Sequence, residues 1–352
     1  MSYRGLKVVV TGGAGFIGSN LSLRLLDEGA CLTVIDNLIP GCGGKQFHLK
    51  PLEDRAKLIW ADIGERTSEL EQALASADVI FNLAGEISHI HSMQFPERDL
   101  QVNTVSQLRF LLQCAEQNPG VRVVYAGTRQ VYGVPKYLPI DEKHPIQPVD
   151  FNGIHKYAAT MYHEMLSRAG NLDAVVLRLT NVYGPRMAIE ISCQGVLSNF
   201  LRRALLGEQI EVFGDGQQFR DPVYIDDAVD AFLLAGTAPK HSASYNVGGP
   251  EALSLLTIAK VASETAGSPP PVLRPFPAER KVIDIGSYRS DSSKICRELG
   301  WSPRIHIEEG MKRTLAYFSE HLNQYLGDIP STQPCPMPEH RVPHRLTYGV
   351  VR

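Results

Sequence analysis

The sequence predicts an α/β fold in which a doubly wound parallel sheet is followed by a smaller C-terminal α/β region. Short apolar runs rich in β-branched residues alternate with helical patterns through the first half of the chain, which is the order expected when helices cover both faces of a parallel sheet. Runs such as residues 6–11 are mostly apolar, as in strands buried on both faces. A glycine-rich turn separates this run from the first helical segment.

The elements of the first half follow from these patterns in order. Apolar residues that recur every three or four positions predict helices, and short continuous apolar runs between turn residues predict buried strands. We expect strands at residues 6–11, 31–36, 57–61, 79–83, 121–126 and 174–179, and helices at 16–28, 69–76, 97–117 and 152–168.

Beyond about residue 180 the pattern becomes less regular. The sequence predicts a first domain over 1–180, to which some later segments return, and a smaller domain over 181–325. The smaller domain is expected against the carboxyl edge of the sheet, where open α/β sheets have their crevice. The proline-rich stretch 326–352 is predicted to be an extended tail. In the smaller domain we expect helices at 195–206, 226–234 and 255–266 and a strand at 245–247.

The composition excludes several classes of protein. The chain has 352 residues, and 35 basic and 38 acidic residues give a net charge of −3. This balance is not that of a protein that binds nucleic acid or an anionic membrane, and no apolar stretch is long enough to cross a bilayer. The six cysteines are scattered without a C-x-x-C pair, which predicts reduced thiols in the cytoplasm and no metal site.

The glycine-rich turn is the strongest functional signal. Gly12 permits a tight turn, Gly15 lets the backbone approach a pyrophosphate, and Gly18 lets the helix pack on the strand. Amide groups at the start of the helix then bind the phosphates. Asp36 ends the next strand, about 20 residues after Gly15, where a carboxylate binds ribose hydroxyls and repels a 2′-phosphate. Because no arginine follows Asp36 directly, the motif predicts a Rossmann-type domain that binds NAD in preference to NADP.

With these motifs and several others in order along the chain, the sequence resembles the extended short-chain dehydrogenase/reductase superfamily, and within it the NAD-dependent sugar-nucleotide epimerase/dehydratase family. The resemblance covers about residues 5–325. Its further motifs are 61–63 (ADI), 82–85 (NLAG), 177–186 (LRLTNVYGPR), 213–216 (FGDG) and 299–303 (LGWSP). It implies that NAD is bound by Gly12, Gly15, Phe16, Ile17, Gly18, Asp36, Asn37, Asp62, Ile63, Leu83, Ala84, Asn103 and Lys156.

The catalytic positions depart from the family pattern at one point. Members carry Ser or Thr, then Tyr-x-x-x-Lys on a helix, and the tyrosine acts as acid and base at a sugar hydroxyl. Here Thr128 and Lys156 match the Ser/Thr and the lysine, but Asn152 stands in place of the tyrosine. The spacing of four residues places Asn152 and Lys156 on the same face of a helix. An amide has no protonation equilibrium near neutral pH, so Asn152 cannot act as a general base.

Three interpretations of this substitution are open. In the first, another group transfers the proton, and the candidates are His89, His91, His155 and Tyr157, of which the histidines have a suitable unperturbed pKa. In the second, Asn152 orients the sugar, and a bound water or a substrate group relays the proton. In the third, the protein binds NAD and a nucleotide without performing this chemistry.

The residues after Thr128 discriminate among the family's reactions. Dehydratases resemble Thr-Asp-Glu here, because elimination needs an extra acid and base, whereas this chain has Arg129 and Gln130. Decarboxylases of this family carry glutamate where Gln130 stands. An epimerase needs only to remove a hydride and a proton from one carbon and return the hydride to its other face. The resemblance therefore implies an epimerase of the UDP-glucose 4-epimerase type, with a dehydratase, a decarboxylase or an inactive binding protein as alternatives.

The resemblance also implies a nucleotide-sugar substrate, bound by the domain over 181–325, and a homodimer. Asn181, Arg220 and Lys281 match positions that contact the substrate's phosphates. Arg129 either pairs with a substrate carboxylate or caps a neighbouring acid. The helices at 97–117 and 152–168 match the pair that forms a four-helix dimer interface in the family. Apolar residues at helical spacing fit that interface and fit packing on the sheet equally well; they are Leu108, Leu111, Leu112 and Ala115.

Overall fold

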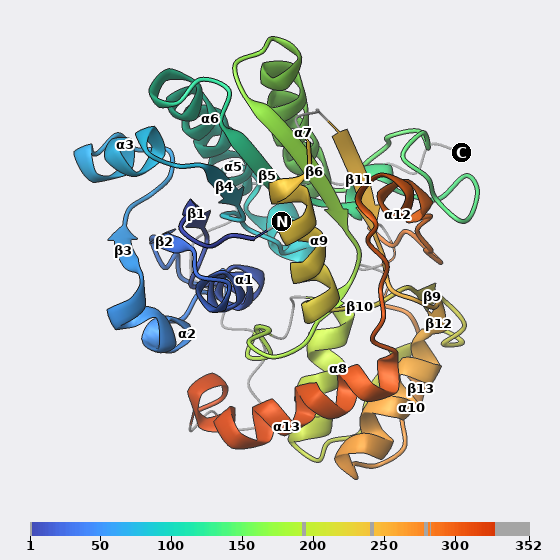
Figure 1. Ribbon diagram of the computed structural model, residues 1–352. Coiled ribbons are helices and arrows are strands. Elements are labelled where there is room, and N and C mark those ends of the chain that lie inside the picture. Colours follow the sequence, from blue (N-terminus) through green and yellow to red (C-terminus); the bar gives the residue numbers. More distant parts are fainter. Residues whose placement is uncertain (1, 192–194, 240–242, 278–280, 282, 328–352) are drawn as a thin grey trace.

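The computed structural model describes residues 2–191, 195–239, 243–277, 281 and 283–327. Its centre is a sheet of seven strands: β1 (Lys7–Thr11), β2 (Cys31–Asp36), β3 (Lys57–Trp60), β4 (Val79–Asn82), β5 (Arg122–Thr128), β6 (Asp173–Leu179) and β11 (Ala243–Val247). They lie in the order β11-β6-β5-β4-β1-β2-β3 (Figure 1), and every neighbouring pair is parallel. The strand order reverses between β1 and β4, which is where open α/β sheets bind ligands. The predicted fold class is confirmed.

Helices cover both faces of this sheet. They are α1 (Phe16–Asp27), α3 (Ser68–Ala75), α6 (Ser106–Gln117), α7 (Phe151–Arg168) and α9 (Ile225–Thr237). On one face, α1 and α9 pack against each other and bury Leu21 and Phe232 in a common core. On the opposite face, α3, α6 and α7 bury Leu70, Phe110 and Leu166 in a second core. The apolar stripe of each helix faces the strands, as the alternating pattern predicts.

A smaller region lies beside the carboxyl ends of the strands (Figure 1). Three of its helices, α8 (Val196–Leu205), α10 (Leu255–Ala266) and α13 (Ile307–Tyr325), pack against one another. Beside them, β8 (Glu211–Phe213) pairs with β13 (Val272–Arg274), and β9 (Phe219–Arg220) pairs with β12 (Leu253–Ser254). The chain after residue 180 contributes to both regions, because β11 is a strand of the large sheet and α9 packs against it. The tail expected at 326–352 lies outside the described residues from 328 onward. The remaining elements are α2 (Gln46–Leu49), β7 (Val182–Tyr183), which pairs with β10 (Val223–Tyr224), and α12 (Ser293–Leu299).

The helix predicted at 97–117 is divided in the structure. It consists of α5 (Pro96–Leu100), a π turn over Gln101–Val105 and then α6, and a short helix that was not predicted, α4 (His89–Gln94), precedes it. Inside the π turn, the side chain of Asn103 accepts a hydrogen bond from the backbone N–H of Glu86 at 3.1 Å and donates one to its carbonyl at 2.9 Å. The π turn therefore lies where the helix meets the segment after β4, and such turns often mark functional sites.

Three global features bear on the predicted compartment and cofactors. No helix among the described residues is long and apolar enough to cross a membrane. The four cysteines in the described part of the chain, Cys31, Cys42, Cys114 and Cys296, are free thiols. The same part contains no group of three or more His, Cys, Asp or Glu side chains placed to hold a metal ion.

Candidate active site

A cavity of about 500 Å³ lies between the large sheet and the smaller region. One side is formed by the turn after β1 and by the carboxyl ends of β2, β4, β5 and β6. The other side is formed by α8, β8, Phe276 and residues 283–285. Its volume falls in the range of sites for small ligands. The cavity therefore occupies the crevice that the strand order predicts.

The glycine-rich turn lines one part of this cavity. Gly12 has a φ of +67°, in the left-handed region that glycine adopts without strain. A Cβ atom at Gly12 would lie 2.8 Å from backbone atoms of Leu83 and Ala84. A Cβ atom at Gly18 would overlap the carbonyl oxygen of Gly12. Glycine at these positions thus lets α1 begin close against β1 and β4, with its amide groups available to a phosphate.

Asp36 ends β2 in the same part of the cavity. Its Oδ2 accepts a hydrogen bond from the backbone N–H of Ala14 at 2.9 Å, and its Oδ1 accepts one from that of Leu38 at 2.8 Å. Burial raises the pKa of the Asp36 carboxyl, and these backbone hydrogen bonds oppose the rise. Beside it, Asn37 donates to Oδ2 of Asp62 at 3.1 Å. The carboxylate therefore orders the glycine-rich turn as well as facing the cavity.

Most of the predicted cofactor residues come together in the cavity. Asn103 is the exception, because it is buried behind Gly85 and holds the backbone of Glu86 instead. The predicted residues that line the cavity are Gly12, Gly15, Phe16, Ile17, Gly18, Asp36, Asn37, Asp62, Ile63, Leu83, Ala84 and Lys156.

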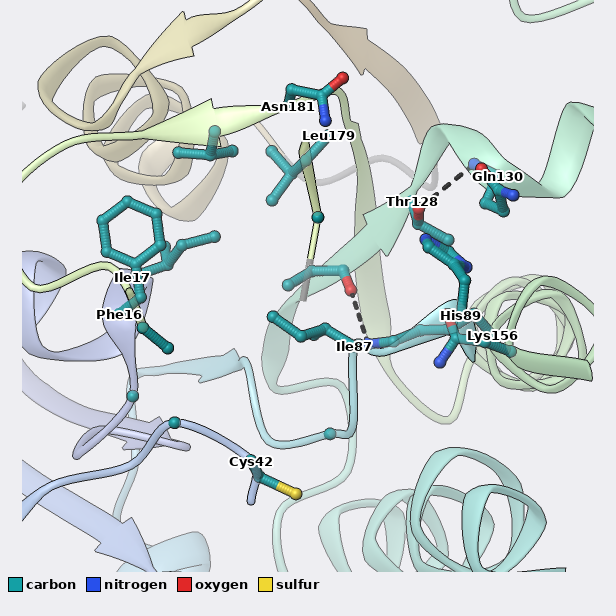
Figure 2. A pocket seen from close by; sticks show the side chains of 18 of the residues that line it. Phe16, Ile17, Cys42, Ile87, His89, Thr128, Gln130, Lys156, Leu179 and Asn181 are labelled. Atoms are coloured by element: carbon teal, nitrogen blue, oxygen red, sulfur yellow. Dashed lines mark hydrogen bonds between the residues drawn. The ribbon is translucent and has the colours of Figure 1, made fainter. Parts of the chain in front are cut away.

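Lys156 lies on α7 and lines the cavity together with Thr128 at the end of β5 (Figure 2). Its side chain is 5% exposed. Among the described residues, Nζ donates one long hydrogen bond, 3.4 Å to the carbonyl of Ala126, and it lies 5.3 Å from the ring centre of Tyr125. Burial lowers the pKa of Lys156 to about 8, and the negative charge of Asp99 opposes this shift. The ammonium is thus poorly partnered within the protein and available to a ligand.

Asn152 also lines the cavity, one turn of α7 before Lys156. Its Nδ2 donates to the carbonyl of Glu86 and to Oδ2 of Asp99, both at 2.9 Å. The amide therefore ties α7 to the segment after β4 and to α5. Thr128 accepts a hydrogen bond from the backbone N–H of Gln130 at 3.2 Å.

Of the four groups considered as replacements for the tyrosine, His89 lines the cavity and the other three do not. Nδ1 of His155 lies 2.7 Å from Oδ1 of Asp99. His91 lies beside the Glu86 carboxylate. Tyr157 packs against the core that contains Val131 and Ile140.

Two arginines line the part of the cavity nearest the smaller region. Arg129 donates to Oδ1 of Asn181 at 3.2 Å, while its buried Nη1 has no hydrogen-bond partner among the described residues. Arg220 donates to the carbonyls of Phe219 and Gly286. Burial lowers the pKa of Arg129, and burial together with the charge of Arg129 lowers that of Arg220 to about 9. Arg220 also lies 4.0 Å from Oδ1 of Asp284. Two buried cations, one of them with an unpartnered Nη1, suit an anionic ligand.

For Lys281 and Asp150 the structure adds information that the sequence analysis lacked. Lys281 is exposed and is not among the residues that line the cavity. Asp150 was not singled out, yet its carboxylate contacts both His89 and Gln130, which line the cavity. An aspartate directly before a predicted helix is a typical N-cap, and this was the available signal for it.

The family model described as "NAD dependent epimerase/dehydratase family" matches residues 8–248, more than half of the chain. The chain belongs to the NAD-dependent epimerase/dehydratase family. Its cofactor is therefore NAD, and the residues in the cavity fit this group. The start of α1 lines the cavity and offers its backbone amide groups to a diphosphate, Asp36 presents a carboxylate for a ribose, and the poorly partnered ammonium of Lys156 suits a second ribose.

Individual relatives in this family are similar over nearly the whole chain. The UDP-glucose 4-epimerase of Mycolicibacterium smegmatis is 33% identical over 318 residues, which is 89% of this chain and 98% of that protein. UDP-glucuronic acid decarboxylase 1 of Xenopus tropicalis is 31% identical, over 96% of this chain and 78% of that protein. The structure of UDP-glucose 4-epimerase from Thermotoga maritima with UDP-glucose superposes with a TM-score of 0.81 and 32% identity, over 90% of this chain and 99% of that one.

Proposed function

We propose that the cavity converts a nucleotide-activated sugar into its epimer. This proposal is based on one observation: a single cavity contains two kinds of site. One is the glycine-rich turn together with Thr128 and Lys156, and the other is the part lined by arginines beside the smaller region. The known relatives support the same reaction, because two of those described above are UDP-glucose 4-epimerases. NAD, when bound, accepts a hydride from the sugar and returns it.

The residues of the chain would hold the two ligands for this exchange. The amide groups after Gly12 would bind the cofactor's phosphates, Asp36 one ribose, and Lys156 the ribose next to the nicotinamide. Thr128 would hold the sugar hydroxyl. The substrate's diphosphate would lie against Asn181, Arg129 and Arg220, with Lys281 as a further contact at the exposed edge.

Decarboxylation of a nucleotide sugar acid is the second candidate. The similarity to a UDP-glucuronic acid decarboxylase favours it, and the unpartnered Nη1 of Arg129 would suit a carboxylate. Against it, Gln130 replaces the expected glutamate, and its side chain donates to Asp150 at 2.8 Å, so that it is held as a neutral structural group. We therefore place epimerisation first.

Incubating the purified chain and NAD with a panel of sugar nucleotides tests this function. We expect a UDP-hexose to yield its C4 epimer, resolved by chromatography, with no net consumption of NAD. Release of carbon dioxide from a uronic acid substrate would instead support the decarboxylase. NAD binding without any conversion across UDP-, dTDP-, CDP- and GDP-sugars would favour a binding protein.

We propose further that the protein is a cytoplasmic homodimer joined through α5, α6 and α7. These helices expose apolar side chains to solvent: Leu100, Leu112, Ile154 and Met165. Light scattering of the full chain is expected to give twice the mass of one chain. Leu112→Glu is expected to yield monomers, because a buried unpaired carboxylate would oppose the interface. Leu273→Glu, on the exposed face of β13, is the matched control and should leave the mass unchanged.

A further inference from the structure

Epimerisation requires a group that takes a proton from the sugar hydroxyl, and Asn152 does not supply one. Among the described residues that line the cavity there is no tyrosine, and His89 is the single histidine. Asp36 and Asp62 follow β2 and β3, which are three and four strand positions from β5 and Thr128, separations of about 14 Å or more. Burial raises the pKa of the Cys42 thiol to about 11. Glu211 and Asp284, in the smaller region, are engaged with arginines. His89 is therefore the titratable side chain to consider beside Lys156.

The segment after β4 brings His89 to the cavity, and hydrogen bonds fix that segment. Asn103 and Asn152 both donate to the carbonyl of Glu86 at 2.9 Å, from the π turn and from α7. Ser88 then caps α4, its hydroxyl accepting a backbone N–H at 3.2 Å, so that His89 begins the helix. The amide at the position of the missing tyrosine thus holds the backbone that carries the histidine.

A buried carboxylate lies beside the imidazole. Nδ1 of His89 is at an ion-pair distance of 3.0 Å from Oδ2 of Asp150, whose side chain is fully buried, and it has no other partner among the described residues. Asp150 is itself held in place, because it accepts the backbone N–H of Gly153 at 2.6 Å as the N-cap of α7 and the side-chain N–H of Gln130 at 2.8 Å. Burial alone would raise the pKa of Asp150, but the contact with His89, together with the hydrogen bonds from Gly153 and Gln130, keeps that pKa below the usual value. An ionised carboxylate at Nδ1 places the acceptor nitrogen of a neutral imidazole at Nε2.

The opposite nitrogen of the ring is free to act. Nε2 makes no hydrogen bond among the described residues, and the side chain is 34% exposed to the cavity and solvent. Figure 2 shows His89, Lys156 and Thr128 gathered at the same side of the cavity. The arrangement resembles other histidine–carboxylate pairs in which the acid fixes the tautomer and stabilises the imidazolium.

We propose that His89, oriented by Asp150, is the proton acceptor and donor at the sugar hydroxyl during epimerisation. The proposal rests on the proposed function. The O–H bond of the sugar would break, its proton would move to Nε2 of His89, and its electron pair would form a C=O bond, while the hydride from the same carbon would pass to NAD. After the ketone rotates to present its other face, the hydride would return to the carbon and the imidazolium would return its proton to the oxygen. Asp150 is a positioning residue, since it acts through His89.

Three variants test this assignment on the substrate that the wild-type protein converts. His89→Ala is expected to lower kcat by about 10²–10⁴-fold, with NAD content and KM close to the wild-type values, and added imidazole should restore part of the turnover in a saturable manner. Asp150→Asn, which retains a good N-cap, is expected to keep the melting temperature and to lower kcat by about 10²-fold because it disturbs the tautomer. His91→Ala is the matched control from the same helix and should retain kcat.

The outcomes separate this assignment from the function on which it rests. A wild-type protein that converts no sugar nucleotide overturns both. With an active wild type, the assignment alone is overturned if His89→Ala keeps more than a third of kcat. It is also overturned if His89→Ala binds NAD normally, is inactive and gains nothing from imidazole, because His89 would then have a structural role. If Asp150→Asn retains the kcat of the wild type, Asp150 does not act as a positioning residue for His89.

Discussion

Replacing Lys156 with methionine is expected to abolish turnover and, at the same time, to stabilise the protein in the absence of NAD. We expect kcat to fall by at least about 10²–10³-fold, because the substitution removes a positioned charge from the reacting region. The free energy of unfolding should rise by about 1–3 kcal/mol, because a buried ammonium with one long hydrogen bond is replaced by an apolar side chain of similar length.

The stabilisation is expected to depend on pH. Burial lowers the pKa of Lys156 from 10.5 to about 8 in the folded protein. Below pH 8 the lysine is charged in both the folded and the unfolded chain, so the full cost of burying the charge is present. Between pH 8 and 10.5 the unfolded chain binds more protons, and the wild type therefore gains stability as the pH rises. Urea unfolding at pH 7 to 10 should show the difference between K156M and wild type shrinking; a variant less stable than wild type at pH 7 would contradict this account.

Gly18→Ala is expected to lower both the affinity for NAD and the stability of the fold. The added methyl group would overlap backbone atoms of Gly12 and Gly13, so that α1 must move away from the turn. We expect a loss of about 1–3 kcal/mol in the free energy of unfolding. We also expect the dissociation constant for NAD, measured by calorimetry, to rise by at least about 10²-fold, because phosphate binding depends on the position of these amide groups.

A second glycine supplies the control for this experiment. Gly170 has a φ of +78° and open space around the position of a Cβ atom. Gly170→Ala should therefore cost about 1 kcal/mol of stability through backbone strain while leaving NAD affinity unchanged. Equal losses of NAD affinity in the two variants would mean that general destabilisation, and not the geometry of the turn, governs binding.

The local pattern of apolar residues was sufficient to predict many of the strands and helices. The strand at 31–36 and the helix at 255–266 have the predicted bounds. The short apolar run of the strand suits burial in the sheet, and the apolar residues of the helix recur at the spacing that buries one of its faces against neighbouring helices. The break in the helix at 97–117 was not predictable in this way, since Asn103 contacts a segment 17 residues earlier in the chain. Helix α13 does carry such a pattern, since Ile307, Met311, Leu315 and Phe318 recur at helical spacing and are buried, although it was not among the predicted helices. The strands of the smaller region have two or three residues each and are too short to carry one.

The residues of the site also differ in whether local sequence motifs could predict them. The glycines, Asp36, Thr128 and Lys156 belong to motifs whose geometry is local, and all of them line the cavity. The approach of His89 to Asp150 joins segments 61 residues apart and depends on how the loop after β4 meets the start of α7. The sequence identified His89 as one of four candidates; its choice over the others required the fold.

The hydrogen bonds of Asn152 also limit how this site can change over evolutionary time. The side chain is 1% exposed and binds both the carbonyl of Glu86 and the carboxylate of Asp99, which also binds His155. A tyrosine at position 152 would deprive both oxygens of this donor. Any exchange at position 152 therefore acts on three segments of the chain at once: α7, the segment after β4 and α5.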